Sequence, residues 1–128
     1  MTVKDHYLQW VLEQLSGAER ISSRRMFGGV GLYRDHVFFG IISGDTLYFK
    51  VDDASRAHYE TRGMSQFRPF RDKPLLSMSY YEVPADVLED AEECVEWAMR
   101  AVAAGIAKAR SPNRRKRDSQ RRGRADRR

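Results

Sequence analysis

Cysteine, long apolar runs and clustered metal ligands are all scarce in this 128-residue sequence, and each scarcity excludes a class of protein. The single cysteine, Cys94, rules out an internal disulfide and fits a reducing compartment. No apolar stretch approaches the roughly eighteen residues that a membrane-spanning helix requires, and the first residues lack the apolar core of a signal peptide. We therefore expect a cytoplasmic protein that makes no membrane contact.

Patterns that support catalysis or metal binding are also missing. Ser77 and Ser79 lack the Gly-x-Ser-x-Gly turn that exposes a nucleophile, and Cys94 lies beside the apolar stripe of an acidic helix, where burial should raise the thiol pKa. The residues that could bind a metal are scattered without Cys-x-x-Cys or His-Glu-x-x-His spacing: His6, His36, His58 and Cys94. We expect no enzymatic activity, no catalytic residues, no metal site and no cofactor.

Three glycines gather between residues 28 and 31, but they do not form a phosphate-binding loop. Gly28, Gly29 and Gly31 lead into a strand with no lysine nearby, whereas nucleotide-binding loops pass from a strand into a helix. A bulge or a positive-φ connection is the structural interpretation, and a groove for a ligand or peptide is the alternative. A group of acidic residues between 86 and 96 is consistent with a solvated helix start or with a docking surface for a basic partner.

Periodicity along the chain predicts an α+β fold in two layers, with a mainly antiparallel sheet of about five strands. Apolar spacing predicts an N-terminal helix over 4–15 ended by Gly17 in a left-handed cap, a middle helix over 54–62 ended by Gly63, and a long C-terminal helix from about residue 90. We expect the buried stripe of that last helix to be Ala91, Val95, Ala98, Val102 and Ile106. Strands are predicted over 24–27, 30–34, 36–43, 46–51, 67–70 and 75–83.

The net positive charge of the chain comes from its last eighteen residues. Residues 111–128 contain nine basic and two acidic residues, a net charge of +7, while residues 1–110 have a net charge of −2. Such a segment cannot bury enough apolar surface to fold, so we predict a folded domain over 1–110 and a disordered arginine-rich tail over 111–128. The candidate nucleic-acid contacts are a stretch that interleaves cations with Phe67 and Phe70 and the tail itself: Arg68, Arg71, Lys73, Arg114, Arg115, Lys116, Arg117, Arg121, Arg122 and Arg124.

Three blocks occur in a fixed order after the first helix: the segment 25–35, the segment 47–52 and the segment 78–84. Over roughly residues 4–108 the sequence resembles the N-terminal domain of the TfoX/Sxy family of competence regulators. The motif positions that carry the resemblance, as structural or candidate binding residues, are Met26, Phe27, Gly28, Gly29, Gly31, Tyr33, Lys50, Ser79, Tyr80 and Tyr81.

The resemblance implies an α+β domain and a regulatory role in natural competence, exercised with the cyclic-AMP receptor protein and without catalysis. Full-length regulators of this family carry a second, helical domain where this sequence has the arginine-rich tail. Two functions remain open. One is a regulatory module that binds a protein partner through its folded domain, and the other is a protein that binds the phosphates of DNA or RNA through its tail.

Overall fold

A computed structural model of the chain describes residues 3–26, 28–68 and 79–109. The Phe27 motif position, residues 69–78 and the proposed tail therefore lie outside the described residues. The elements follow the order α1 (Asp5–Gln14), β1 (Ile21–Met26), β2 (Gly29–Arg34), β3 (Val37–Ser43), β4 (Thr46–Lys50), α2 (Asp53–Thr61), β5 (Tyr80–Glu82), α3 (Ala85–Leu88) and α4 (Ala91–Ala109).

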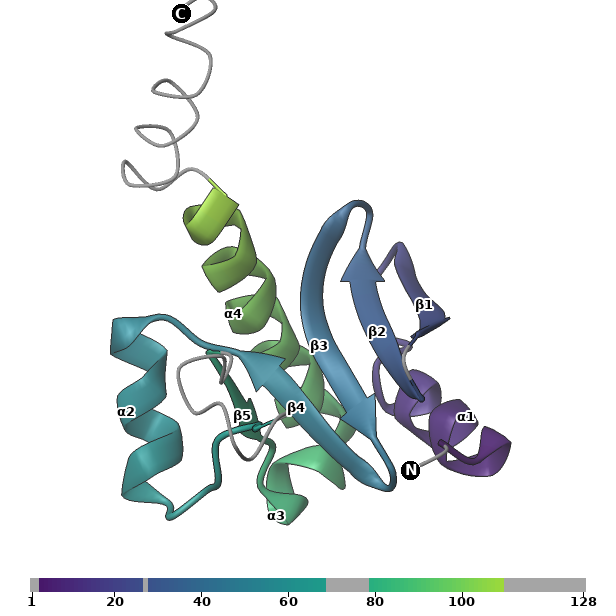
Figure 1. Cartoon of the computed structure of the whole chain (residues 1–128), viewed down its shortest axis with the longest axis horizontal. Coiled ribbons are helices and arrows are strands. Elements are labelled where there is room, and N and C mark those ends of the chain that lie inside the picture. Colours follow the sequence, from purple (N-terminus) through teal and green to yellow (C-terminus); the bar gives the residue numbers. More distant parts are fainter. Residues whose placement is uncertain (1–2, 27, 69–78, 110–128) are drawn as a thin grey trace, which may run out of the picture.

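The five strands form one antiparallel sheet in the order β1-β2-β3-β4-β5. Strands that are consecutive in sequence are therefore neighbours in space, and β3 is the central strand, which explains why its sequence is apolar on both faces. Helices α1 and α4 cover one face of the sheet (Figure 1). The predicted two-layer α+β fold is confirmed. None of the helices in the described segments is long and apolar enough to cross a membrane.

The tight connections use residues in the left-handed region of backbone space. Gly28 joins β1 to β2 with φ 79°, and Asp35 and Gly44 close the next two hairpins with φ 56° and 63°. The positive-φ interpretation of the glycine segment is confirmed at Gly28, and Gly63 ends α2 as predicted, with φ 74°. The prediction for Gly17 is wrong. Gly17 is not in the left-handed region, because the end of α1 is closed by amides that bond back three to four residues, starting with Leu15 at φ −95°.

The hydrophobic core lies between the sheet and its helices. Helix α4 approaches β3 closely, since a Cβ placed on Gly105 would lie 2.9 Å from Val37 Cγ1 and 3.0 Å from the Phe38 carbonyl oxygen. Small residues on α4 allow this approach. The largest fully buried side chains include Phe39, Phe49, Leu32, Ile42 and Leu47 from the sheet, Val11 and Leu15 from the α1 segment, and Cys94 from α4.

The predicted buried stripe of α4 is only partly correct. Ala98 and Val102 are buried, but Ala91 is exposed and Ile106 is 36% exposed. The positions that replace them in the core are Cys94, Ala101 and Ala104. Close packing against the sheet selects small side chains here, whereas apolarity alone favours the larger ones.

Two strand predictions also need correction. The first strand begins at Ile21, three residues before the predicted start, because β1 is an edge strand whose serines and arginines hide the apolar alternation. Phe67 and Arg68 are not in a strand, although Gln66 forms an isolated bridge with Tyr81. The last strand covers Tyr80–Glu82 within the predicted 75–83, and the start of that predicted strand falls outside the described residues.

Candidate functional site

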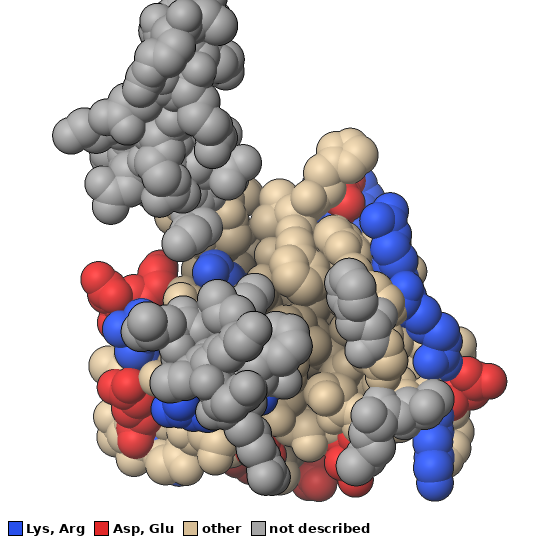
Figure 2. Space-filling view, viewed as in Figure 1, with Lys and Arg blue, Asp and Glu red and all other residues tan. Residues whose placement is uncertain are grey.

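The sheet face that carries no helix is the main surface that the core does not use. Directly paired residues of antiparallel strands point to the same face, so the pairing of Arg24 with Gly31 and of Ile41 with Gly31 and Tyr48 defines one row across it. Figure 2 views the molecule from this side. We call this surface the helix-free face, and its residues include Ser22, Arg24, Met26, Gly31, Tyr33, Phe38, Ile41, Tyr48, Lys50, Phe67, Tyr80 and Glu82.

Aromatic rings run across the helix-free face. The rings of Tyr33 and Phe38 have centroids 5.1 Å apart, and those of Phe38 and Tyr80 are 5.6 Å apart. The Tyr48 ring lies 4.8 Å from that of Phe67. Burial raises the pKa of both Tyr48 and Tyr80, so both hydroxyls stay protonated at neutral pH.

Two cations flank these rings. The Arg24 guanidinium lies 5.7 Å from the centroid of the Tyr33 ring, and the Lys50 ammonium lies 5.3 Å from that of Tyr80. Both distances are within the range of cation–π attraction. The face therefore combines buried and partly buried aromatic rings with these two cations and with the Glu82 carboxylate, which lies opposite Tyr48.

Gly31 lies beneath the side chains of Met26, Phe38 and Tyr33. A Cβ at this position would lie 2.8 Å from Met26 Cε, 3.0 Å from Phe38 Cε1 and 3.3 Å from Tyr33 Cε1. A side chain here would require the flexible end of Met26 to move and the Phe38 and Tyr33 rings to shift slightly. Gly29 has a different constraint, since its Cβ would lie 2.8 Å from the backbone oxygen of Ile42. The glycine motif thus has a steric basis in the fold.

The structure brings five of the predicted motif residues together on the helix-free face: Met26, Gly31, Tyr33, Lys50 and Tyr80. It places two others elsewhere. Tyr81 points to the helix side, where its ring lies 5.8 Å from that of Tyr59 and its hydroxyl donates a 2.8 Å hydrogen bond to Glu60. Ser79 contributes its carbonyl, which accepts a 2.9 Å hydrogen bond from the Val51 amide.

Sequence reasoning missed Arg24, Phe38 and Tyr48 as members of this surface. The period-two alternation of β4 separates Tyr48 from the buried Leu47 and Phe49, so that signal was available. Phe38 could not be assigned to a face, because a register shift between Leu32 and Tyr33 interrupts the β2–β3 pairing.

The candidate nucleic-acid residues are only partly placed. Arg68 is exposed and follows Phe67, whose ring contacts Tyr48. The remaining candidates lie outside the described residues: Arg71, Lys73, Arg114, Arg115, Lys116, Arg117, Arg121, Arg122 and Arg124.

Catalytic and metal chemistry has little support in the described segments. They contain no group of three or more His, Cys, Asp or Glu side chains that could hold a metal ion. Cys94 is fully buried, and burial raises the pKa of its thiol to about 12, as the sequence predicted. The thiol therefore stays protonated and cannot act as a thiolate nucleophile at neutral pH.

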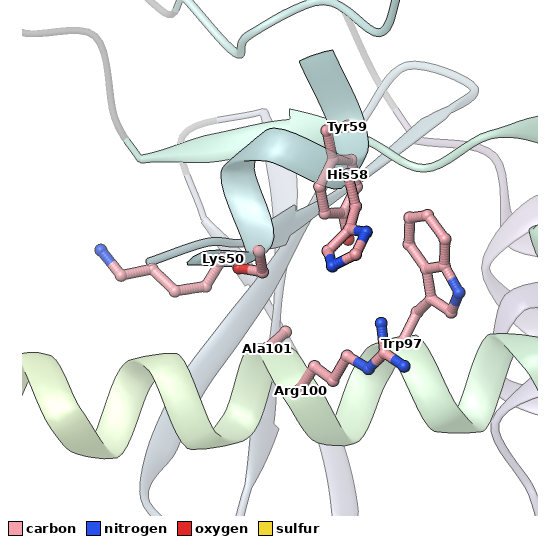
Figure 3. A pocket seen from close by; sticks show the side chains of 7 residues that line it. Lys50, His58, Tyr59, Trp97, Arg100 and Ala101 are labelled. Carbon is pink, nitrogen blue, oxygen red and sulfur yellow. The ribbon is translucent and has the colours of Figure 1, made fainter. Parts of the chain in front are cut away.

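A small gap between α2 and α4 is lined by His58, Tyr59, Trp97 and Arg100, and Figure 3 shows the Lys50 ammonium extending away from it. Its volume of about 10 Å³ accommodates roughly one water molecule. The Tyr59 and Trp97 rings meet edge-to-face at 4.9 Å, and Arg100 forms an ion pair with Glu96 at 3.4 Å. The gap belongs to the packing of the two helices and is too small for a ligand.

These features define a two-layer α+β domain with helices on one face of its sheet and an aromatic row flanked by cations on the other. The TfoX N-terminal domain family matches residues 13–105, and the chain belongs to this family. The chain is also 27% identical over 84 residues to the DNA transformation protein TfoX1 of Aliivibrio fischeri. That match covers 60% of this chain and 40% of the relative, so the chain spans less than half of the relative's length. The family predicted from the sequence motifs is confirmed.

Proposed function

We propose that this domain is a non-enzymatic regulatory module that acts by binding a protein partner through its helix-free face. One observation carries the proposal: five family-motif residues gather on the sheet face opposite the main core cluster, where Met26, Tyr33 and Lys50 are partly exposed and Gly31 and Tyr80 are buried beneath them. Motif residues that served only to stabilise the fold would be expected mainly in the core on the other side of the sheet.

The chemistry of this face favours a protein as the partner. Tyrosine, phenylalanine and arginine are the residue types enriched in the central parts of protein–protein interfaces. Tyr33, Phe38 and Tyr48 are half-buried, so they are held in place by neighbours before any partner arrives. Preorganised aromatic side chains lose little conformational entropy on binding. The relative's role in DNA transformation supports a regulatory process as the setting.

A matched pair of substitutions tests the proposal. Tyr48→Ala removes an aromatic ring from the helix-free face, whereas Ile106→Ala removes an exposed apolar side chain from α4. Immobilised wild-type protein and both variants are used to capture partners from an extract treated with nuclease. We expect Tyr48→Ala to lose the proteins that the wild type retains and Ile106→Ala to keep them. Equal capture by all three folded proteins would exclude the helix-free face as the binding surface.

A second function is favoured by the charge distribution. Residues 111–128 carry a net charge of +7, and such a segment is suited to binding the phosphates of DNA or RNA without reading their sequence. In this alternative the tail supplies the affinity and the domain determines where the protein acts. Removal of the tail should leave partner binding by the folded domain intact and should abolish nucleic-acid binding.

A further inference from the structure

The outer edge of β1 is the open edge of the sheet. At the opposite edge, the segment before residue 68 already bonds to β5, because the Phe67 amide donates to the Tyr80 carbonyl at 2.8 Å and the Glu82 amide donates to the Ser65 carbonyl at 2.9 Å. Strand β1 pairs with β2 on its inner side, and no other strand of the described part of the chain pairs with its outer side. An unpaired edge is a template for an additional strand.

The hydrogen-bonding pattern identifies which backbone groups of β1 point outward. The Asp35 amide donates to the Arg20 carbonyl at 3.1 Å, so these two residues form a hydrogen-bonded pair. Hydrogen-bonded and non-hydrogen-bonded pairs alternate in an antiparallel ladder. Ser22 and Arg24 therefore bond to β2, while Ile21, Ser23 and Arg25 direct their amides and carbonyls away from the sheet.

This edge is positively charged. Figure 2 shows cationic side chains along the margin of the molecule where β1 lies in Figure 1. Arg20 is paired with Asp35 at 2.9 Å and Arg25 with Asp5 at 2.6 Å. Arg24 contacts the Tyr33 ring, and within residues 3–26, 28–68 and 79–109 it has no carboxylate partner. Its positive charge is therefore available to a ligand.

A pocket of about 200 Å³ lies beside this guanidinium. It is lined by Ser22, Ser23, Arg24, Tyr33, Asp35 and His36. Because Arg20 already occupies both carboxylate oxygens of Asp35 at 2.9 Å, the unpaired charge of the pocket is that of Arg24. The Ser22 hydroxyl, on the same face as the Arg24 side chain, adds a hydrogen-bond donor. The lining suits a carboxylate, and the volume admits a whole side chain.

We propose that β1 binds an extended acidic segment of a partner protein as a sixth strand, with an Asp or Glu side chain of that segment in the pocket beside Arg24. The outward backbone groups of Ile21, Ser23 and Arg25 supply strand pairing, and the pocket selects an acidic residue. This inference rests on the proposed function, since it identifies the class of partner and the edge by which that partner joins the sheet.

The charge of the edge disfavours a second copy of the chain as the occupant. Two β1 strands related by a twofold axis would bring the arginines of both copies together, and like charges at a strand pair are destabilising. An acidic segment removes the repulsion instead.

The test is a subtractive selection of displayed random heptapeptides against full-length protein. Peptides that bind the Ser23→Pro variant are first depleted, which also removes those bound by the basic tail. Ser23→Pro deletes an outward amide without removing a β1–β2 hydrogen bond, and proline is tolerated at such edge positions. Selected peptides are then synthesised, with and without N-methylation at alternate amides, and their affinities are measured for the wild type and for Ser23→Pro, Arg24→Gln and Arg56→Gln.

We expect selected peptides to carry Asp or Glu at alternate positions and to lose affinity about tenfold or more with Ser23→Pro, with Arg24→Gln and on N-methylation. Arg56→Gln, at a half-buried arginine of α2 that pairs with Asp53, should leave affinity unchanged. Melting temperatures verify that each variant is folded, and if Ser23→Pro is not, Arg24→Gln and the N-methylated peptides decide.

Four results would overturn the inference. Selection could yield no peptides or peptides without acidic residues. The wild type could form a dimer that Ser23→Pro disrupts, which would assign the edge to a second copy. Single-stranded DNA could bind with a dependence on Arg24 but not on Ser23→Pro, which would assign the pocket to phosphate. If Tyr48→Ala abolishes partner capture while the edge variants have no effect, the proposed function stands and the β1 inference fails.

Discussion

Asp52 begins helix α2 through a reciprocal pair of hydrogen bonds. The Ser55 amide donates to Asp52 Oδ1 at 2.8 Å, and the Asp52 amide donates to Ser55 Oγ at 3.0 Å. The bond from the Ser55 amide is the main reason that the pKa of Asp52 is lowered. The sequence predicted a cap at Asp52 or Asp53, and the structure assigns it to Asp52.

We expect Asp52→Ala to destabilise the fold by about 1 kcal/mol at neutral pH, since a helix cap is lost. A lowered folded-state pKa stabilises the protein above the unfolded-state value of about 4, and this stabilisation disappears as the pH falls through the folded-state pKa. Urea unfolding of both proteins should therefore show a stability difference that is largest near neutral pH and shrinks in acid. A difference that stays constant across the range would contradict the role of the carboxylate.

Gly29 and Gly17 differ in the space that their surroundings leave for a side chain. A Cβ at Gly29 would lie 2.8 Å from the Ile42 backbone oxygen, whereas a Cβ at Gly17 would lie 3.4 Å from Val95 Cγ2, an ordinary contact. We expect Gly29→Val to lower the free energy of unfolding by roughly 1–3 kcal/mol, because the backbone of β3 must shift, and Gly17→Ala to change it little. Thermal melts measure both. A stable Gly29→Val variant would remove the steric explanation of the glycine motif.

The positive φ of Gly28 could be predicted from the sequence, but the reason for Gly31 could not. Gly28 stands between two strands, where a chain reversal needs such a residue. The space around Gly31 is narrowed by Met26 and Phe38, which are brought together only when the strands pair.

Among the elements, β3 and the two hairpins that flank it could be predicted directly from the sequence. Local turn residues and an apolar central strand are strong short-range signals. Strand β1 and the face of α4 were less predictable, because the first is a polar edge and the second depends on how closely the helix approaches Val37. The helix-free face itself was not predicted. The motif named five of its residues, but Phe38 could not be assigned because its position depends on the register shift.

The backbone amides of β1 should alternate between slow and fast hydrogen exchange. Those of Ser22 and Arg24 bond to β2, so they should exchange with deuterium more slowly than the outward amides of Ile21, Ser23 and Arg25. Residue-resolved exchange by NMR measures this alternation in the free protein. Correspondingly, Ser22→Pro should lower the melting temperature more than Ser23→Pro, because it removes a bond of the β1–β2 ladder. Uniform exchange along β1, or equal melting temperatures, would contradict the assigned pattern.

At the scale of the whole molecule, charge separates a body of net −2 from an end of net +7. If residues 111–128 contact about five phosphates, the affinity for duplex DNA should fall with salt with a log–log slope of roughly −3.5 to −4.5. Little discrimination between sequences should accompany this binding, since phosphate contacts carry no base information. Fluorescence anisotropy of full-length and 1–110 proteins across a salt series measures the slope. Equal binding by the shortened protein would move the site to the domain, with Arg68, Arg71 and Lys73 as the first residues to replace.

The proposed function depends on the domain and not on its basic end. Among the described residues the core extends from Val3 to Ala104, and the family match ends at residue 105, so we expect a protein of residues 1–110 to keep the fold. The most direct measurement compares partner capture by full-length and 1–110 proteins from extract with and without nuclease. We expect the same proteins to be retained by both, with no effect of nuclease. Loss of those proteins on shortening the chain, or on nuclease treatment, would contradict the account and favour nucleic-acid binding through the tail.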